Sequence, residues 1–84
     1  MSELKPIAIA RVIEELEKIS AARRDGALDK DEYEHKFARM IGELRDRRID
    51  GTRVEITTAL GGAAASGKVS QADIDRILKQ LGLA

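Results

Sequence analysis

The sequence of 84 residues contains no cysteine and no tryptophan, and only 2% of its residues are aromatic. Without cysteine the chain cannot form disulfide bonds, thiolate zinc sites or a cysteine nucleophile. Lysine plus arginine number 15 and aspartate plus glutamate also number 15, so the basic excess of a non-specific nucleic-acid binder is missing. Long apolar runs are missing too, because Arg11 interrupts the run near the start of the chain. We therefore expect no secretion signal and no membrane helix, and a cytoplasmic location.

The residues that are present are typical of one small folded domain, since 43% are apolar and 36% are charged. Its core is expected to be thin, because a chain of this length buries only roughly 60–65% of its unfolded surface. Self-association is one way in which such a chain can bury more apolar surface.

Apolar residues recur at helical spacing in four segments, which predicts an all-α fold of two antiparallel hairpins packed as a small bundle. The first hairpin is expected over residues 1–48 and the second over 52–84. Within the first helix, residues 4–24, Pro6 is expected in the first turn, where its missing N–H is tolerated. The predicted core consists of Ile9, Val12, Ile13, Leu16, Ile19, Tyr33, Phe37, Met40, Ile41, Leu44, Ile56, Leu60, Ile74, Ile77, Leu78 and Leu81.

Helix starts are marked by capping boxes, in which an N-cap side chain and the residue three positions later bond to each other's backbone. The sequence predicts such boxes at Asp29/Glu32 and Thr52/Glu55, and a weaker one at Ser70/Asp73. Residues 53–57 also alternate as a strand does. We favour a helix there, because a single strand has no partner in this sequence.

The two halves overlay at an offset of 41 residues, so that residues 26–34 lie over 67–75. In this overlay Phe37 lies over Leu78, and Ile13 lies over Val54. A duplicated hairpin explains the pattern, because one hairpin cannot cover its own apolar face. The shared requirements of any capped helical hairpin explain it as well, and the sequence leaves both explanations open.

The stretch from Gly26-Ala27-Leu28-Asp29 through Glu32-Tyr33-Glu34 to Lys36 and Met40-Ile41 follows the order of a known bacterial motif. In that motif Gly-x-Ile-Thr precedes Glu-Glu-Phe-Glu, and a lysine comes before a paired apolar end. Residues 16–41 therefore resemble the short C-terminal domain known as SHOCT. The resemblance implies an oligomerisation or protein-interaction role and supplies no enzymatic residues.

Residues 69–78 are similar to the recognition helix of bacterial helix-turn-helix repressors, which places polar residues of its first turn against base edges. The candidate DNA-binding residues are Lys68, Ser70, Gln71, Arg76 and Lys79, with the two lysines on phosphates. Asp73 and Asp75 argue against this hypothesis, because they repel phosphates.

Four arginines near the junction of the hairpins are candidates for binding an acidic partner, with a solvated helix end as the alternative. They are Arg45, Arg47, Arg48 and Arg53. Gly61, Gly62, Ala64 and Ala65 form a small-residue surface that suits a close helix contact or a flexible connection.

Other chemistry has little support in the sequence. Residues 62–68 match the spacing of a phosphate-binding loop, but Val69 stands where a hydroxyl would bind magnesium. The acidic residues at 29–34 lack the spacing of a calcium loop and suit a helix N-terminus. No base–nucleophile pair can be assembled around His35, the only histidine.

These observations predict a small non-enzymatic protein-interaction or adaptor module that self-associates. We expect no cofactor and no metal, and a partner that is another protein or a second copy of the chain. The alternative is a small DNA-binding regulator that uses residues 70–79.

Overall fold

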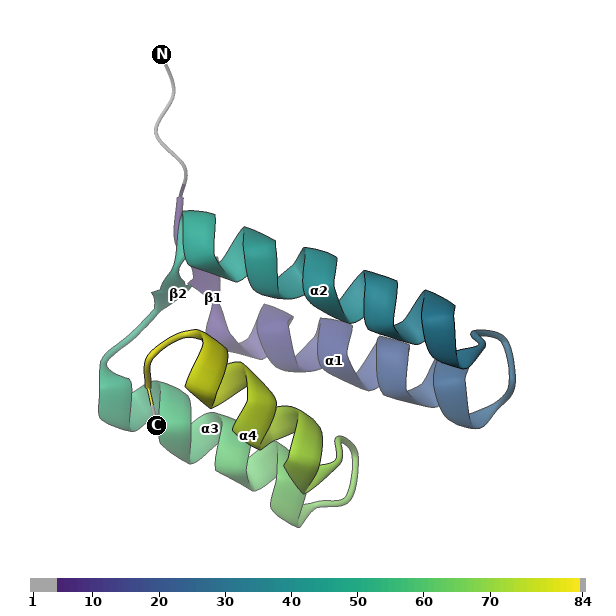
Figure 1. Ribbon diagram of the computed structural model, residues 1–84. Helices are drawn as coiled ribbons and strands as arrows, with labels where there is room; N and C mark the ends of the chain where they lie inside the picture. Colours follow the sequence, from purple (N-terminus) through teal and green to yellow (C-terminus); the bar gives the residue numbers. More distant parts are fainter. Residues whose placement is uncertain (1–4, 84) are drawn as a thin grey trace.

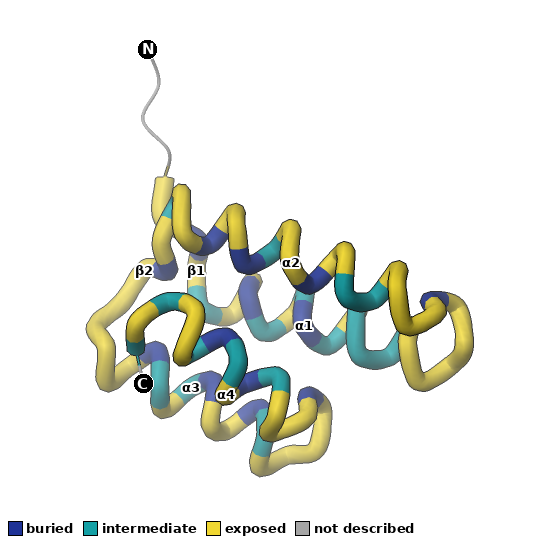
Figure 2. The backbone as a smooth tube through the Cα atoms, viewed as in Figure 1, coloured by how far each residue is buried: buried dark blue, intermediate teal, exposed yellow. Residues whose placement is uncertain are grey.

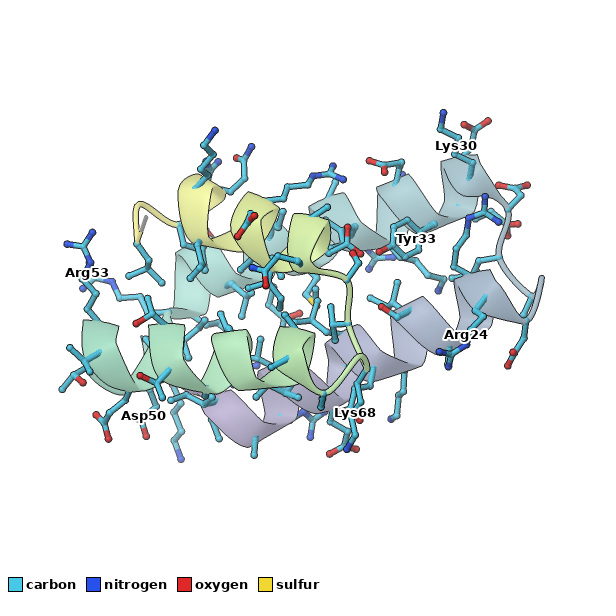
Figure 3. All side chains as sticks on the ribbon, turned by 90° about the horizontal axis from the view of Figure 1, so that it is seen from below. Arg24, Lys30, Tyr33, Asp50, Arg53 and Lys68 are labelled. Atoms are coloured by element: carbon cyan, nitrogen blue, oxygen red, sulfur yellow. The ribbon has the colours of Figure 1, made fainter. Side chains whose placement is uncertain are left out.

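The computed structural model describes residues 5–83 and confirms a mainly all-α bundle. The elements follow one another as β1 (Ile7–Ala8), α1 (Ile9–Arg24), α2 (Lys30–Arg47), β2 (Ile49–Asp50), α3 (Arg53–Ala65) and α4 (Gln71–Gln80). Helices α1 and α2 form one antiparallel hairpin, and α3 and α4 form a shorter one that packs against it (Figure 1). The tip of the first hairpin extends beyond the second (Figures 1 and 3).

A two-residue parallel pairing between β1 and β2 joins the starts of the two hairpins, and it was not predicted. Ile7 pairs with Ile49, and the Ile7 N–H donates to the Arg48 carbonyl at 2.9 Å. Both isoleucines are 9% exposed, so their backbone groups need partners within the protein. The expectation that the first helix begins near residue 4 with Pro6 in its first turn is wrong for Pro6, which lies before β1. Leu4 lies outside the described residues.

Residues 53–57 belong to α3, so the helical prediction for this segment is confirmed. Both strong capping boxes, at Asp29/Glu32 and at Thr52/Glu55, form in full. Ser70 caps α4 by accepting from the Asp73 N–H at 3.2 Å. The Asp73 carboxylate does not complete that box and accepts a hydrogen bond from Tyr33.

The two hairpin turns have the same geometry at the predicted offset of 41 residues. Gly26 and Gly67 have φ values of 82° and 78°, which non-glycine residues rarely adopt. One residue earlier, the Asp25 and Ser66 N–H groups each bond to the carbonyl four residues back, at 2.9 and 3.0 Å. Away from the turns the correspondence weakens, because Ile13 packs on the core whereas Val54 is 72% exposed.

The core lies between the hairpins, where buried residues of all four helices meet (Figure 2). The most completely buried side chains are Phe37, Leu16, Leu60, Ile74, Ile77 and Val69. Every residue of the predicted core is buried or partly buried. The prediction omitted five residues that are buried as well, namely Ile7, Leu28, Ile49, Ala63 and Val69.

The glycines of α3 provide a test of this packing. A Cβ at Gly61 would meet nothing within 4 Å, so Gly61→Ala should raise the free energy of unfolding by about 1 kcal/mol through helix propensity alone. Gly67→Ala is the control and should lower it, because φ is 78° there. Urea unfolding followed by circular dichroism measures both, and destabilisation by Gly61→Ala would contradict the open surroundings of that position.

Candidate functional site

A cluster of polar and aromatic side chains joins α2 to α4. The Tyr33 hydroxyl donates to the Asp73 carboxylate, and Arg76 Nη2 lies 2.8 Å from Glu34 Oε2. The Arg76 guanidinium also lies 4.5 Å from the centre of the Phe37 ring, a cation–π contact. Burial and the neighbouring Asp73 raise the pKa of Tyr33 well above its usual range, so the hydroxyl stays protonated as the donor. The hydrogen bond from Arg76 lowers the pKa of Glu34.

The candidate DNA-binding residues are mostly engaged within the chain. Arg76 lies against α2, and the Ser70 hydroxyl caps α4. Gln71 donates to Asp75 at 2.9 Å, and Lys68 lies 3.8 Å from Glu17. Lys79 is exposed near the end of α4. The DNA-binding hypothesis therefore requires Arg76 to leave the contact between the hairpins before it can reach a base.

The four candidate partner-binding arginines differ in what they contact. Arg45 bonds to the carbonyl and the side chain of Gln80, each at 3.1 Å. Arg53 bonds to the Leu83 carbonyl at 3.2 Å, from the start of α3 (Figure 3). Both arginines thus neutralise carbonyl groups at and after the C-terminal end of α4, where a helix carries partial negative charge.

The other two arginines of this set lie at the end of α2. Arg47 bonds to the Lys5 carbonyl at 2.9 Å and to Glu43 at 3.1 Å. Arg48 is exposed and has a positive φ of 68°. Arg45 and Arg48 border a cavity of about 450 Å³ whose other walls are mainly leucine and isoleucine.

A larger groove of about 720 Å³ runs between α1 and α2. Apolar side chains of both helices line it, with the half-buried Ile19 and Met40 among them. Its rim carries charges of both signs, namely Arg11, Lys36, Arg39 and Arg47 against Glu15, Glu43 and Asp46. Sequence reasoning missed this groove, because a groove between two helices depends on how they pack and not on the apolar stripe of either one.

The small-residue surface of α3 is open on its outer side. Gly61 and Gly62 are exposed, and a Cβ added at either position would meet nothing within 4 Å. Ala63, in contrast, is buried, and Ala64 packs on the core. The phosphate-loop pattern at residues 62–68 begins inside α3, so four of its seven residues are helical and do not form a loop.

Among residues 5–83, no three histidine, aspartate or glutamate side chains gather in a way that could hold a metal ion. No helix in that part of the chain is both long enough and apolar enough to cross a bilayer.

No protein-family model, curated protein or solved structure matches this chain. The similarity of residues 16–41 to the SHOCT domain therefore remains a resemblance of sequence motif.

The Glu34–Arg76 pair predicts how the stability of the bundle varies with pH. Because the pKa of Glu34 is lower in the folded state, its contribution is present above the ordinary value of 4.5 and is lost as the pH falls through the folded value. Glu34→Gln should therefore lower the free energy of unfolding at neutral pH. The difference from the wild type should disappear at acidic pH. Chemical unfolding at several pH values measures this, with Glu14→Gln as the control because the Glu14–Lys18 pair is solvated. A difference in unfolding free energy that stays constant with pH would contradict a stabilising charge on Glu34.

Proposed function

We propose that this protein is a small interaction module that associates with a second copy of itself through the groove between α1 and α2. The observation that carries the proposal is the groove itself, in which the partly exposed Ile19 and Met40 lie among charged side chains of both signs. Such a surface suits protein recognition, where an apolar centre is desolvated and a polar rim remains in contact with water.

The thin core supports a role in association. The second hairpin covers one side of the first hairpin, and the groove leaves part of Ile19 and Met40 in contact with water. Covering these side chains with a partner removes apolar surface from water, which is favourable. The chain has a formal net charge of zero, so two copies meet without overall repulsion.

The rim also distinguishes a protein partner from a nucleic acid. Glu15, Glu43 and Asp46 line the groove beside its basic residues. A phosphate backbone laid along the groove would meet these three carboxylates, which repel it. A protein surface of mixed charge can satisfy both signs.

Sedimentation over about a hundredfold range of concentration tests the proposal, because mass action shifts a self-associating chain from monomer to dimer. Gly42 lines the groove, is exposed and has open space around it, so Gly42→Gln should fold normally and obstruct the groove. We expect this variant to weaken the dimer by about tenfold or more, which corresponds to about 1.4 kcal/mol.

Gly61→Gln is the matched control, since Gly61 is also an exposed helical glycine but lies on α3, outside the groove. It should leave association unchanged. A strict monomer at high concentration for the wild-type chain would overturn the proposed self-association.

A further inference from the structure

Four of the five charges that α2 presents at the groove are ordered along the helix, and the fifth, Arg47, is paired with Glu43 of the same helix. Lys36 and Arg39 lie in its N-terminal part, and Glu43 and Asp46 lie in its C-terminal part. All four are exposed. Glu43 uses one carboxylate oxygen for Arg47, at 3.1 Å, and its second oxygen has no hydrogen bond within residues 5–83.

These four positions are symmetric about one level of the helix. Arg39 and Glu43 lie two residues on either side of Ile41, and Lys36 and Asp46 lie five residues on either side. At a rise of 1.5 Å per residue, the two pairs stand about 3 Å and about 7.5 Å from that level. Within this set of four, each basic residue is therefore matched by an acidic residue at the same distance on the other side.

A two-fold axis that runs beside the exposed side of α2, perpendicular to the helix and level with Ile41, would place a second α2 antiparallel to the first. Arg39 of each copy then lies at the level of Glu43 in the other copy, and Lys36 lies at the level of Asp46. A two-fold contact uses each pair twice, so the arrangement forms four ion pairs between the copies. A parallel arrangement in register would instead place each residue opposite its own copy, and like charges would meet.

We infer that the partner of the groove is a second copy of this chain, bound with its α2 antiparallel across a two-fold axis that passes beside α2 at the level of Ile41. This inference rests on the proposed function and specifies its geometry. Gly42 lies next to the axis and is exposed, so it adds no side chain that would keep the helices apart. The half-buried Met40 lies on the other side of the axis level and adds apolar contact area.

The ion pairs are expected to determine which arrangement forms more than how tightly it forms. Exposed charge pairs contribute little to affinity, whereas like charges placed together at an interface are clearly unfavourable. Reversing the sign of either the two basic or the two acidic positions should therefore abolish the dimer. Mixing the two reversed variants should restore it, because opposite charges then face each other.

Two charge-reversed variants test the inference. Lys36→Glu/Arg39→Glu makes the four positions acidic, and Glu43→Lys/Asp46→Lys makes them basic. Each variant alone should be monomeric at concentrations where the wild-type chain is dimeric. An equimolar mixture should form a heterodimer, because every acidic position of one chain then faces a basic position of the other. Circular dichroism checks that each variant keeps its helices.

Arg23→Glu/Arg24→Glu is the control for the change in net charge, since both residues are exposed at the end of α1 and lie outside the groove. It should dimerise as the wild type does. High salt should weaken the heterodimer, because screening acts on exposed ion pairs.

The results separate this inference from the proposed function. If the wild-type chain associates and both variants associate equally well on their own, the antiparallel α2 contact is wrong and the self-association proposal stands. If the mixture gives no heterodimer although each variant is folded and monomeric, the contact is also wrong. If the wild-type chain is monomeric throughout, the proposed function itself fails.

Discussion

The two hairpins depend on each other to remove their apolar faces from water. Neither hairpin can cover its own stripe, and the completely buried side chains come from both, including Phe37 of the first and Ile74 of the second. The parallel pairing of Ile7 with Ile49 joins the starts of the hairpins and so fixes where the two stripes meet. Polar contacts such as the Glu34–Arg76 pair also join the two hairpins. The groove remains on a side of the first hairpin that the shorter second hairpin does not cover.

Several charged residues that the sequence suggested for binding a partner instead hold the helices of this chain together. Arg45, Arg53 and Arg76 attracted attention in the sequence as candidates for binding DNA or an acidic partner. In the structure their guanidinium groups bond to Gln80, Leu83 and Glu34, respectively. A guanidinium has several donors in a fixed fork, which suits it to hold the carbonyls at the end of a helix or the carboxylate of a neighbouring helix. Other charged residues, among them Lys36, Arg39 and Asp46 of α2, are exposed as well.

Features that depend on local sequence were predictable. Helical spacing, capping side chains and the glycines at positive φ identified the four helices and both turns, because each acts within a few residues of its own position. Features that depend on distant residues were not. The strand pair joins residues 42 positions apart, and two-residue strands carry no periodicity. The groove, and the packing of Arg76 against Phe37, likewise follow from how the helices pack. No single-helix pattern could have indicated that Asp73 would bond to Tyr33 and leave its capping box incomplete.

The two ends of the described chain lie at the same end of the bundle, near the strand pair. Arg47 holds the Lys5 carbonyl and Arg53 holds the Leu83 carbonyl, so both ends of the described chain lie at the base of the bundle beside the strands (Figure 1). A tag or a neighbouring domain fused at either end would therefore leave from the same pole. The opposite end of the bundle carries the two glycine turns and lies away from such attachments. A label or a surface tether at either terminus would therefore leave the two turns accessible.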